Sequence, residues 1–325
     1  MSEDNILTGS ELISALTETG VAAGRTSFFQ SLDWLRFWNA QQGFESCAVV
    51  AFDNKHLRGY LPFCTRTNHG IVECYSMPMG TYGSAVALDD SGDIRDLLTS
   101  HFLDWCRKKN CSRINVVEFS SQTDQVLEQF EIRELTTQIV DLGGGEELLR
   151  SALSENHRRN IEKCRNYNLS CRRVGSDCDV AAYFSLVEDG AKCRGAKPFY
   201  DFDFYTSLLN HIPGDNLLWE LVCLDDKPCT GHIYFKWANS VFYWDGASSG
   251  AGLEALANFY LFWRNIRQFE DEGFAHLNLG SSPEAAQDLI RFKRGWGAKQ
   301  VNYFEYNWSS VTYRGMKQIK DWLGR

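Results

Sequence analysis

Two stretches of similar pattern decide how this sequence folds: DNKHLRGYLPFCT at residues 53–65 and DDKPCTGHIYFKW at residues 225–237. Each begins with polar turn residues and continues into a run rich in apolar and aromatic residues, which is typical of a strand. The first follows the strand-like CAVVAFD, and the second follows the strand-like LLWELVCLD. The sequence therefore predicts the same antiparallel hairpin in each half of the chain.

The elements around these hairpins follow one order in both halves: meandering strands, a long helix, a strand, a helix and a strand. We expect the long helices at residues 93–109 and 253–272. Alternation of antiparallel strands with crossover helices implies a mixed sheet. The predicted fold class is α/β (α+β), with two related domains whose mixed, mostly antiparallel sheets are flanked by helices.

Three consecutive glycines, residues 143–145, separate the strand-like TTQIVDL from a helix-like segment. They interrupt both flanking patterns and give the backbone freedom. No GxGxxG spacing and no Lys-Ser/Thr pair accompany them, so a linker is favoured over a phosphate loop. The expected domains are residues 1–142 and 146–325.

The composition bounds the class of protein. With 325 residues, 44% hydrophobic and 14% aromatic, the chain has enough apolar material for two globular domains. It has no run of about 18 apolar residues, so no transmembrane segment is expected. The acidic start, MSEDNILTGS, lacks the pattern of a secretion signal, so a cytoplasmic location is expected. Eleven cysteines without a CxxC pair favour reduced thiols over a metal site or a disulfide framework.

The charge is uneven along the chain. The net charge of −9 gives no support for binding to DNA. Residues 1–145 have a net charge of −8 and residues 146–325 a net charge of −1. An anionic ligand is therefore expected at the second half.

The small-residue segment at residues 246–252, GASSGAG, matches the GxSxG pattern of serine hydrolases on paper. Glycines delay the helix that a nucleophile elbow needs, and His276 is the only downstream histidine, so this reading is disfavoured. The alternative is a strand-to-helix turn whose N–H groups bind a pyrophosphate or carboxylate, with Ser249, Gly250 and Gly252 as the candidate donor-binding residues. A plain flexible turn explains the segment equally well.

Two cationic segments stand out in the second half. The first is a predicted helix around Arg158, which either binds phosphates or is an ordinary solvated face. The second is FKRGWGA, in which Lys293 precedes Trp296 between two glycines. A helix C-terminus explains the cations through the helix dipole but does not explain a tryptophan between glycines.

The segments that carry a family resemblance occur in a fixed order: FFQSLDWLRFW, SENHRRNIEKCRNYNLS, RGAKPFYDFDFY, FYWDGASS, ALANFYLFW and LNLGSS…LIRFKRGWGA. Together they resemble the FemAB-like family of GNAT-type acyltransferases over nearly the whole chain. The resemblance implies tandem acetyltransferase-like domains and transfer of an aminoacyl group from aminoacyl-tRNA to an amine of a peptidoglycan precursor. Other members of the family are acyl-CoA N-acyltransferases. The chain lacks the coiled-coil insertion of some cell-wall enzymes and a clear Q/RxxGxG/A loop, so both donors stay open.

The same resemblance assigns roles to residues. It implies that Lys293 lies at the activated intermediate, that Arg194 binds a precursor phosphate and that Arg158 holds a basic position. A lysine there would stabilise the oxyanion of amine attack. Asp245 or Glu305 would accept the amine proton, although each fits a structural carboxylate as well. Further residues expected to line the substrate site are Tyr200, Tyr243, Trp244, Asn258 and Trp296.

The function expected from this sequence is N-acyl transfer from aminoacyl-tRNA or acyl-CoA to an amine of a nucleotide- or lipid-linked cell-envelope precursor. No tightly bound cofactor is expected, and tRNA is a partner if it carries the donor group. The alternative is a non-catalytic scaffold or binding subunit in polysaccharide or exopolysaccharide biosynthesis.

Overall fold

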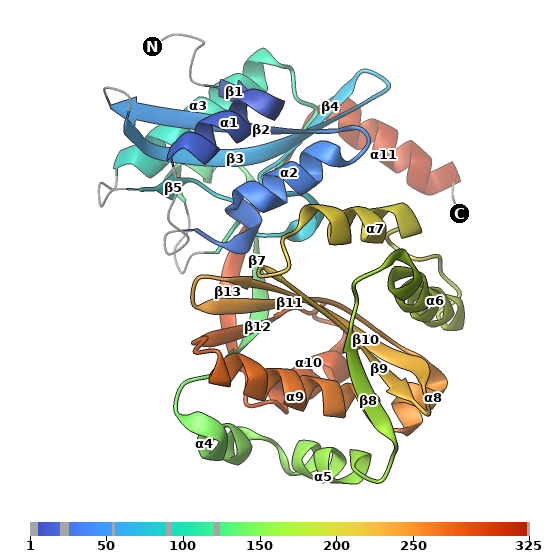
Figure 1. Cartoon of the computed structure of the whole chain (residues 1–325). Coiled ribbons are helices and arrows are strands. Elements are labelled where there is room, and N and C mark those ends of the chain that lie inside the picture. The colour runs from blue at the N-terminus through green and yellow to red at the C-terminus, as the bar shows by residue number, and fades with distance from the viewer. Residues whose placement is uncertain (1–5, 20–25, 54–55, 89–92, 120–123, 324–325) are drawn as a thin grey trace. The chain divides into compact units, whose positions relative to one another are not determined.

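The structure is a computed structural model that describes residues 6–19, 26–53, 56–88, 93–119 and 124–323 (Figure 1). The chain forms two compact units. The first consists of residues 1–135 and 302–325, and the second of residues 136–301. Each unit has its own strands and its own apolar core.

The first unit combines strands with helices before and after its meander. Its strands are β1 (Ile6–Thr8), β2 (Phe44–Asp53), β3 (His56–Asn68), β4 (Ile71–Tyr75), β5 (Val86–Ala87), β6 (Arg113–Glu118) and most of β13 (Lys299–Ser309). Its helices are α1 (Gly9–Thr19), α2 (Leu32–Ala40), α3 (Asp93–Lys108) and α11 (Val311–Leu323). The strand order is β1-β2-β3-β4-β6-β13, and β5 pairs with β3. Only the β4–β6 pair is parallel, so this sheet is mixed.

The second unit repeats this plan. Its strands are most of β7 (Glu131–Asp141), β8 (Leu169–Arg173), β9 (Leu217–Leu224), β10 (Lys227–Trp237), β11 (Ser240–Ser248) and β12 (His276–Ser281). Its helices are α4 (Gly145–Ala152), α5 (Glu155–Cys164), α6 (Asp177–Cys193), α7 (Phe202–His211), α8 (Gly250–Glu254), α9 (Ala257–Asp271) and α10 (Gln287–Arg294). The strand order is β8-β9-β10-β11-β12-β7, and only the β11–β12 pair is parallel.

The six-strand order of each unit, called its sheet here, therefore matches that of the other strand for strand. In each, four antiparallel strands lead to a parallel neighbour, and a sixth strand pairs antiparallel with that neighbour. Two helices lie between the first and second strands, and a long helix lies between the fourth and fifth. The mixed fold and the hairpins expected at residues 53–65 and 225–237 are confirmed by the β2–β3 and β9–β10 pairs.

The sixth strand of each sheet comes from the other half of the sequence. Residues 304–309 of β13 pair with β6 of the first unit, and residues 137–141 of β7 pair with β12 of the second unit. The compact units therefore divide after residues 135 and 301. The division into residues 1–142 and 146–325 stays a prediction about the two repeated modules. The local sequence pattern gives no sign that the modules exchange strands.

Local sequence explains the main elements of the second unit. Ser154, Ser176 and Asp201 cap the N-termini of α5, α6 and α7 through side-chain oxygens that accept backbone N–H groups. The buried side of α9 supplies Phe262, Ile266 and other apolar residues to the core beneath the sheet. In the described part of the chain, no helix has both the length and the hydropathy to cross a membrane. All eleven cysteines are free.

Candidate active site

The parallel strands β11 and β12 run together over only three residue pairs, from Ser240–His276 to Phe242–Asn278. Beyond this point β11 continues to Ser248 in pairing with β10 alone. The C-terminal part of β11 therefore has no neighbour on its β12 side among the described residues. Ligands of open α/β sheets commonly bind at the carboxyl ends of strands, where neighbours part.

A bulge in β12 begins where the two strands part. Pairing with β7 shifts register between Asn278 and Ser281, and Gly280 takes a left-handed conformation with a φ of 74°. The side chain of Asn278 holds the bulge, since its Oδ1 accepts the backbone N–H of Gly280 at 2.9 Å and the hydroxyl of Thr137 at 2.6 Å. The bulge brings two consecutive carbonyl groups to one side chain, that of Lys293.

Lys293 lies on α10 with only 6% of its surface exposed. Its Nζ donates to the carbonyl of Gly280 at 2.8 Å and to the carbonyl of Ser281 at 2.7 Å. A Cβ atom placed on Gly280 would lie 4.0 Å from this Nζ and 3.5 Å from the carbonyl oxygen of Tyr243. The ammonium group is therefore held at the point where β11 and β12 separate.

The ammonium group of Lys293 loses its proton at a lower pH than that of an exposed lysine. Burial lowers the pKa of Lys293 from 10.5 to about 8, because the charged form loses hydration. An ammonium group has three N–H donors, and two of them are committed to the bulge. The third makes no hydrogen bond to the described residues.

Asp245 lies two residues beyond Tyr243 on β11. Its Oδ2 accepts the hydroxyl of Tyr205 at 2.6 Å, and its Oδ1 accepts the backbone N–H of Gly246 at 2.8 Å. Burial raises the pKa of Asp245, while these hydrogen bonds and the positive charge of Arg194 act in the opposite direction. Arg194 itself is exposed at the C-terminus of α6. The structure thus brings Arg194 into electrostatic range of Asp245.

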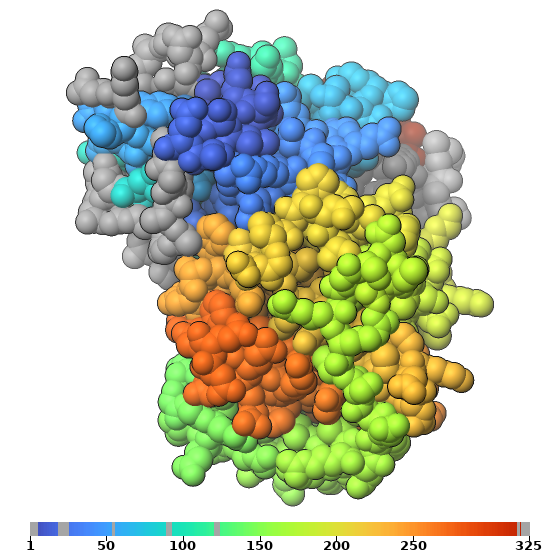
Figure 2. Space-filling view, in the orientation of Figure 1, coloured from blue at the N-terminus to red at the C-terminus, as the bar shows by residue number. Residues whose placement is uncertain are grey.

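Aromatic rings stand beside this carboxylate. Tyr200 stacks on Trp244 with ring centroids 5.1 Å apart, and on Phe204 with centroids 4.1 Å apart. The neighbouring Phe199 has 78% of its surface exposed. Figure 2 shows the segment between α6 and α7, coloured yellow-green to yellow, at the molecular surface. Rings of this kind form a platform for a planar or apolar ligand.

Two of the predicted site residues, Tyr243 and Asn258, contact His232 on the side of the sheet that packs against α9. Tyr243 packs on His232 with centroids 5.2 Å apart, and a Cβ on Gly246 would collide with the Tyr243 hydroxyl. Asn258, on α9, accepts Nε2–H of His232 at 2.6 Å, so the other ring nitrogen accepts the hydroxyl of Tyr234 at 2.9 Å. Burial lowers the pKa of His232 to about 3, so this ring is neutral.

His232 was missed by the sequence reasoning. The only signal was a polar residue inside the apolar run GHIYF, and nothing in that run indicates a partner on α9. The hydrogen bonds that join Asn258, His232 and Tyr234 hold the imidazole ring against which Tyr243 packs.

The small-residue turn is shaped by packing. Ser249 caps α8, and its Oγ accepts the N–H of Gly252 at 3.1 Å. A Cβ on Gly252 would approach the carbonyl oxygen of Cys229 to 2.2 Å, so only glycine fits there. Nothing lies within 4 Å of a Cβ on Gly250. One of the N–H groups proposed for a donor is thus already engaged, and the turn stays a predicted binding element.

The Gly-Trp-Gly turn has a structural explanation. Trp296 is 1% exposed and belongs to the core beneath the sheet, so it does not line an open cleft as expected. A Cβ on Gly295 would lie 2.0 Å from the ring of His157, and one on Gly297 would lie 2.7 Å from the side chain of Ala152. The glycines let α4 and α5 pack against this turn. Arg158, next to His157 on α5, is exposed.

Glu305 lies in the first unit, whereas Lys293 belongs to the second. Its Oε1 accepts Nδ2–H of Asn115 at 2.9 Å, and its Oε2 pairs with Arg133 at 3.1 Å. Both oxygens therefore have structural partners, as do both oxygens of Asp245. Of the two carboxylates considered as proton acceptors, Asp245 is the one that the structure places on the same strand as Tyr243.

Comparison with known proteins agrees with this architecture. Residues 151–303 match the model of the acetyltransferase (GNAT) domain family. No curated protein matches the sequence. The crystal structure of FemX, a FemAB-family protein, is similar with a TM-score of 0.69 and 12% identity, over 94% of this chain and 96% of that one.

Two further structures show the same fold. The C-terminal domain of a putative lysylphosphatidylglycerol synthetase from Agrobacterium fabrum has a TM-score of 0.61 and 12% identity, over 93% of both chains. A tandem GNAT protein from the clavulanic acid biosynthesis pathway has a TM-score of 0.56 and 12% identity, over 94% of this chain and 98% of that one. The expected fold is thus confirmed: the chain is similar in fold to FemX and to a tandem GNAT protein, and residues 151–303 match the GNAT acetyltransferase domain, which supports an acyltransferase.

Proposed function

We propose that this protein is an N-acyltransferase that moves an aminoacyl or acyl group from aminoacyl-tRNA or acyl-CoA to an amine of a cell-envelope precursor. The observation that carries the proposal is the ammonium group of Lys293, which is buried, held by two carbonyls and placed where β11 and β12 part. The GNAT match covers this part of the chain. The donor is a substrate in this proposal and is not a resident cofactor.

The proposed reaction uses the chemistry of these groups directly. A neutral amine attacks the carbonyl carbon of the donor ester or thioester, and the carbonyl oxygen becomes negative. The remaining N–H of Lys293 stabilises that oxygen in a site with little water, an effect worth about 10²–10³ in rate for one donor. Asp245 accepts the proton that the amine loses and passes it to the leaving oxygen or sulfur as the ester or thioester bond breaks, so that the alcohol or thiol is released.

The acceptor is proposed to bind on the side of the sheet that carries Arg194. Arg194 would contact a phosphate of the precursor, and the Tyr200–Trp244 stack would hold an apolar or ring-shaped portion. Arg158 and the Ser249–Gly252 turn are proposed contacts for an anionic donor. The lysylphosphatidylglycerol synthetase and FemX likenesses support an envelope precursor as the acceptor class.

Mass spectrometry tests the proposal. Purified protein is incubated with acyl-CoA or aminoacyl-tRNA donors and with nucleotide-linked and lipid-linked peptide acceptors. We expect the acceptor to gain the mass of the acyl group on an amine, and Lys293→Met to reduce this product strongly. A Lys299→Met variant is the matched control, because Lys299 is exposed at the start of β13. No transfer from any donor by the folded wild-type protein would favour a scaffold role.

A further inference from the structure

The C-terminal helix α11 exposes its apolar side. Successive residues of an α-helix are rotated by about 100°, so Val311, Met316 and Ile319 fall within one arc of roughly 140°. Their exposed fractions are 77%, 40% and 60%. Three large apolar side chains of one helix face thus lie open, whereas scattered single exposures are the ordinary case.

Tyr313 joins α11 to the rest of the first unit. Tyr313 lies outside the apolar arc, and its hydroxyl donates to Oε1 of Glu73 on β4 at 2.5 Å. The N-terminus of the helix is fixed by Ser310, whose Oγ accepts the N–H of Tyr313 at 3.2 Å. A surface helix normally packs its apolar side on the protein and turns its polar side outward. Val311, Met316 and Ile319 depart from this pattern, because their apolar side chains are exposed.

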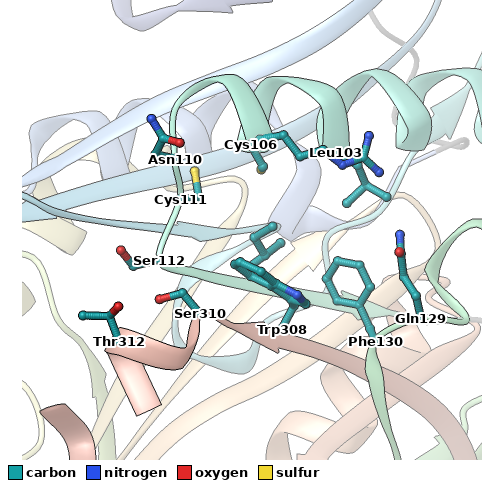
Figure 3. A pocket seen from close by; sticks show the side chains of 12 residues that line it. Leu103, Cys106, Asn110, Cys111, Ser112, Gln129, Phe130, Trp308, Ser310 and Thr312 are labelled. Atoms are coloured by element: carbon teal, nitrogen blue, oxygen red, sulfur yellow. The ribbon is translucent and has the colours of Figure 1, made fainter. Parts of the chain in front are cut away.

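A pocket of about 550 Å³ adjoins the exposed apolar arc (Figure 3). Leu103, Ile114 and Phe130 give it an apolar lining, and side chains of α3 lie opposite those of β13 and the start of α11. Thr312, which falls inside the apolar arc of α11, lines the same pocket. So does Trp308, which is 38% exposed. Thr312 therefore joins the pocket to the arc, and polar side chains such as those of Asn110 and Ser310 also line the pocket.

Cations surround this face although the first unit is acidic. Arg107, Lys108 and Lys109 are exposed at the end of α3, and Arg107 also lines the pocket. The backbone of Ser310 donates to the carbonyl of Ser112 at 2.9 Å, which brings the start of α11 next to this end of α3. Arg314 of α11 is exposed as well. An apolar helix face flanked by cations is typical of helices that lie in the interface of an anionic bilayer.

We propose that the first unit binds the surface of an anionic lipid bilayer through α11. Val311, Met316 and Ile319 enter the boundary between head groups and acyl chains, and the cations near the end of α3 meet the phosphates. The pocket beside Trp308 accepts part of a lipid chain. This inference stands apart from the acyl-transfer proposal, because it rests on residues of the first unit alone and its test measures no activity.

Vesicle co-sedimentation of the full chain tests the inference. We expect binding to vesicles of phosphatidylglycerol and phosphatidylcholine, weaker binding as salt rises, and little binding to phosphatidylcholine alone. Ile319→Glu should weaken binding by roughly tenfold or more, because an exposed apolar contact is replaced by a charge repelled from the surface. Val311→Glu should act alike, and circular dichroism verifies that each variant folds. The matched control is Leu148→Glu, since Leu148 is 59% exposed on α4 of the second unit.

Quenching by brominated acyl chains tests the pocket. Vesicles of brominated phosphatidylglycerol should quench part of the tryptophan fluorescence, and Trp308→Phe should remove that part. Equal binding of the wild-type protein to vesicles with and without phosphatidylglycerol, or unchanged binding by Ile319→Glu, would overturn the proposal. So would a change of oligomeric state in Ile319→Glu without any wild-type vesicle binding, which would make this face a contact between two copies.

Discussion

Replacing Lys293 by methionine tests the charge of the buried ammonium group. The change keeps the apolar stem and its packing but removes three N–H donors and the charge. If Lys293 stabilises the oxyanion, single-turnover acyl transfer should slow by about 10²–10³, which corresponds to roughly 3–4 kcal/mol of transition-state stabilisation. Acceptor binding should change little, because the interaction strengthens only as negative charge develops.

The effect on stability follows from two opposing contributions. A folded-state pKa of about 8 against 10.5 means that the charged lysine disfavours folding by on the order of 3 kcal/mol at neutral pH. This cost is fully present below pH 8 and is relieved as the pH rises from about 8 to 10.5, where the unfolded chain binds the proton more tightly. Against it, the variant leaves the carbonyls of Gly280 and Ser281 without this donor, at about 1–3 kcal/mol for each buried acceptor. The free energy of unfolding should therefore change by no more than about 3 kcal/mol.

Quench-flow kinetics with a saturating donor measure the rate, and urea denaturation measures the stability. Lys293→Gln is the companion variant, because its amide can still donate to the two carbonyls while carrying no charge. Both variants should lose turnover if the charge acts on the substrate. Normal turnover in Lys293→Gln together with loss of turnover in Lys293→Met would refute the reasoning, since it would show that Lys293 only holds the bulge.

Three further predictions follow from the same geometry. The value of kcat/KM, calculated on the concentration of neutral acceptor amine, should fall as the pH rises through about 8, because the acting form of Lys293 is the protonated one. A pH profile of the wild-type protein checks this, and a corrected profile that is flat between pH 7 and 9 would contradict it. Arg194→Ala should move the acidic limb of the same profile to higher pH. The guanidinium group lowers the pKa of Asp245, and the carboxylate must be ionised to accept a proton. An unchanged limb would show that Arg194 does not influence the titration of the proton acceptor. Gly295→Ala should lower the free energy of unfolding by about 1–3 kcal/mol, since its Cβ would meet the ring of His157, whereas Gly214→Ala, with open space at its Cβ, should change it little, and thermal or urea unfolding of the pair decides.

The repeated fold could be predicted because its signals are local. A polar turn before an apolar run marks each hairpin, and helical periodicity marks α3 and α9. The exchange of β7 and β13 between the two sheets could not be predicted, because it depends on which distant strand pairs with β6 or β12. Strand pairing over such separations leaves no mark in the local pattern.

The candidate site was predictable in part for the same reason. The segment FKRGWGA indicates Lys293, but the partners of Lys293 are main-chain carbonyls at a β-bulge, which the local sequence does not predict. Trp296 is expected from the sequence to line the substrate site, but it lies in the core, and its flanking glycines allow packing against His157 and Ala152. Glu305 is expected as an alternative proton acceptor, and its partners Asn115 and Arg133 lie far from it in sequence.

Hydrogen–deuterium exchange with a bound donor tests the central claim most directly. The claim is that an activated donor binds where β11 and β12 part, beside Lys293. Calorimetry first identifies which acyl-CoA or aminoacyl-tRNA binds the full chain, and exchange is then compared with and without that donor. We expect slower exchange in residues 243–249 and 280–281. Tight binding of a donor that leaves both segments unchanged and protects residues elsewhere would contradict it.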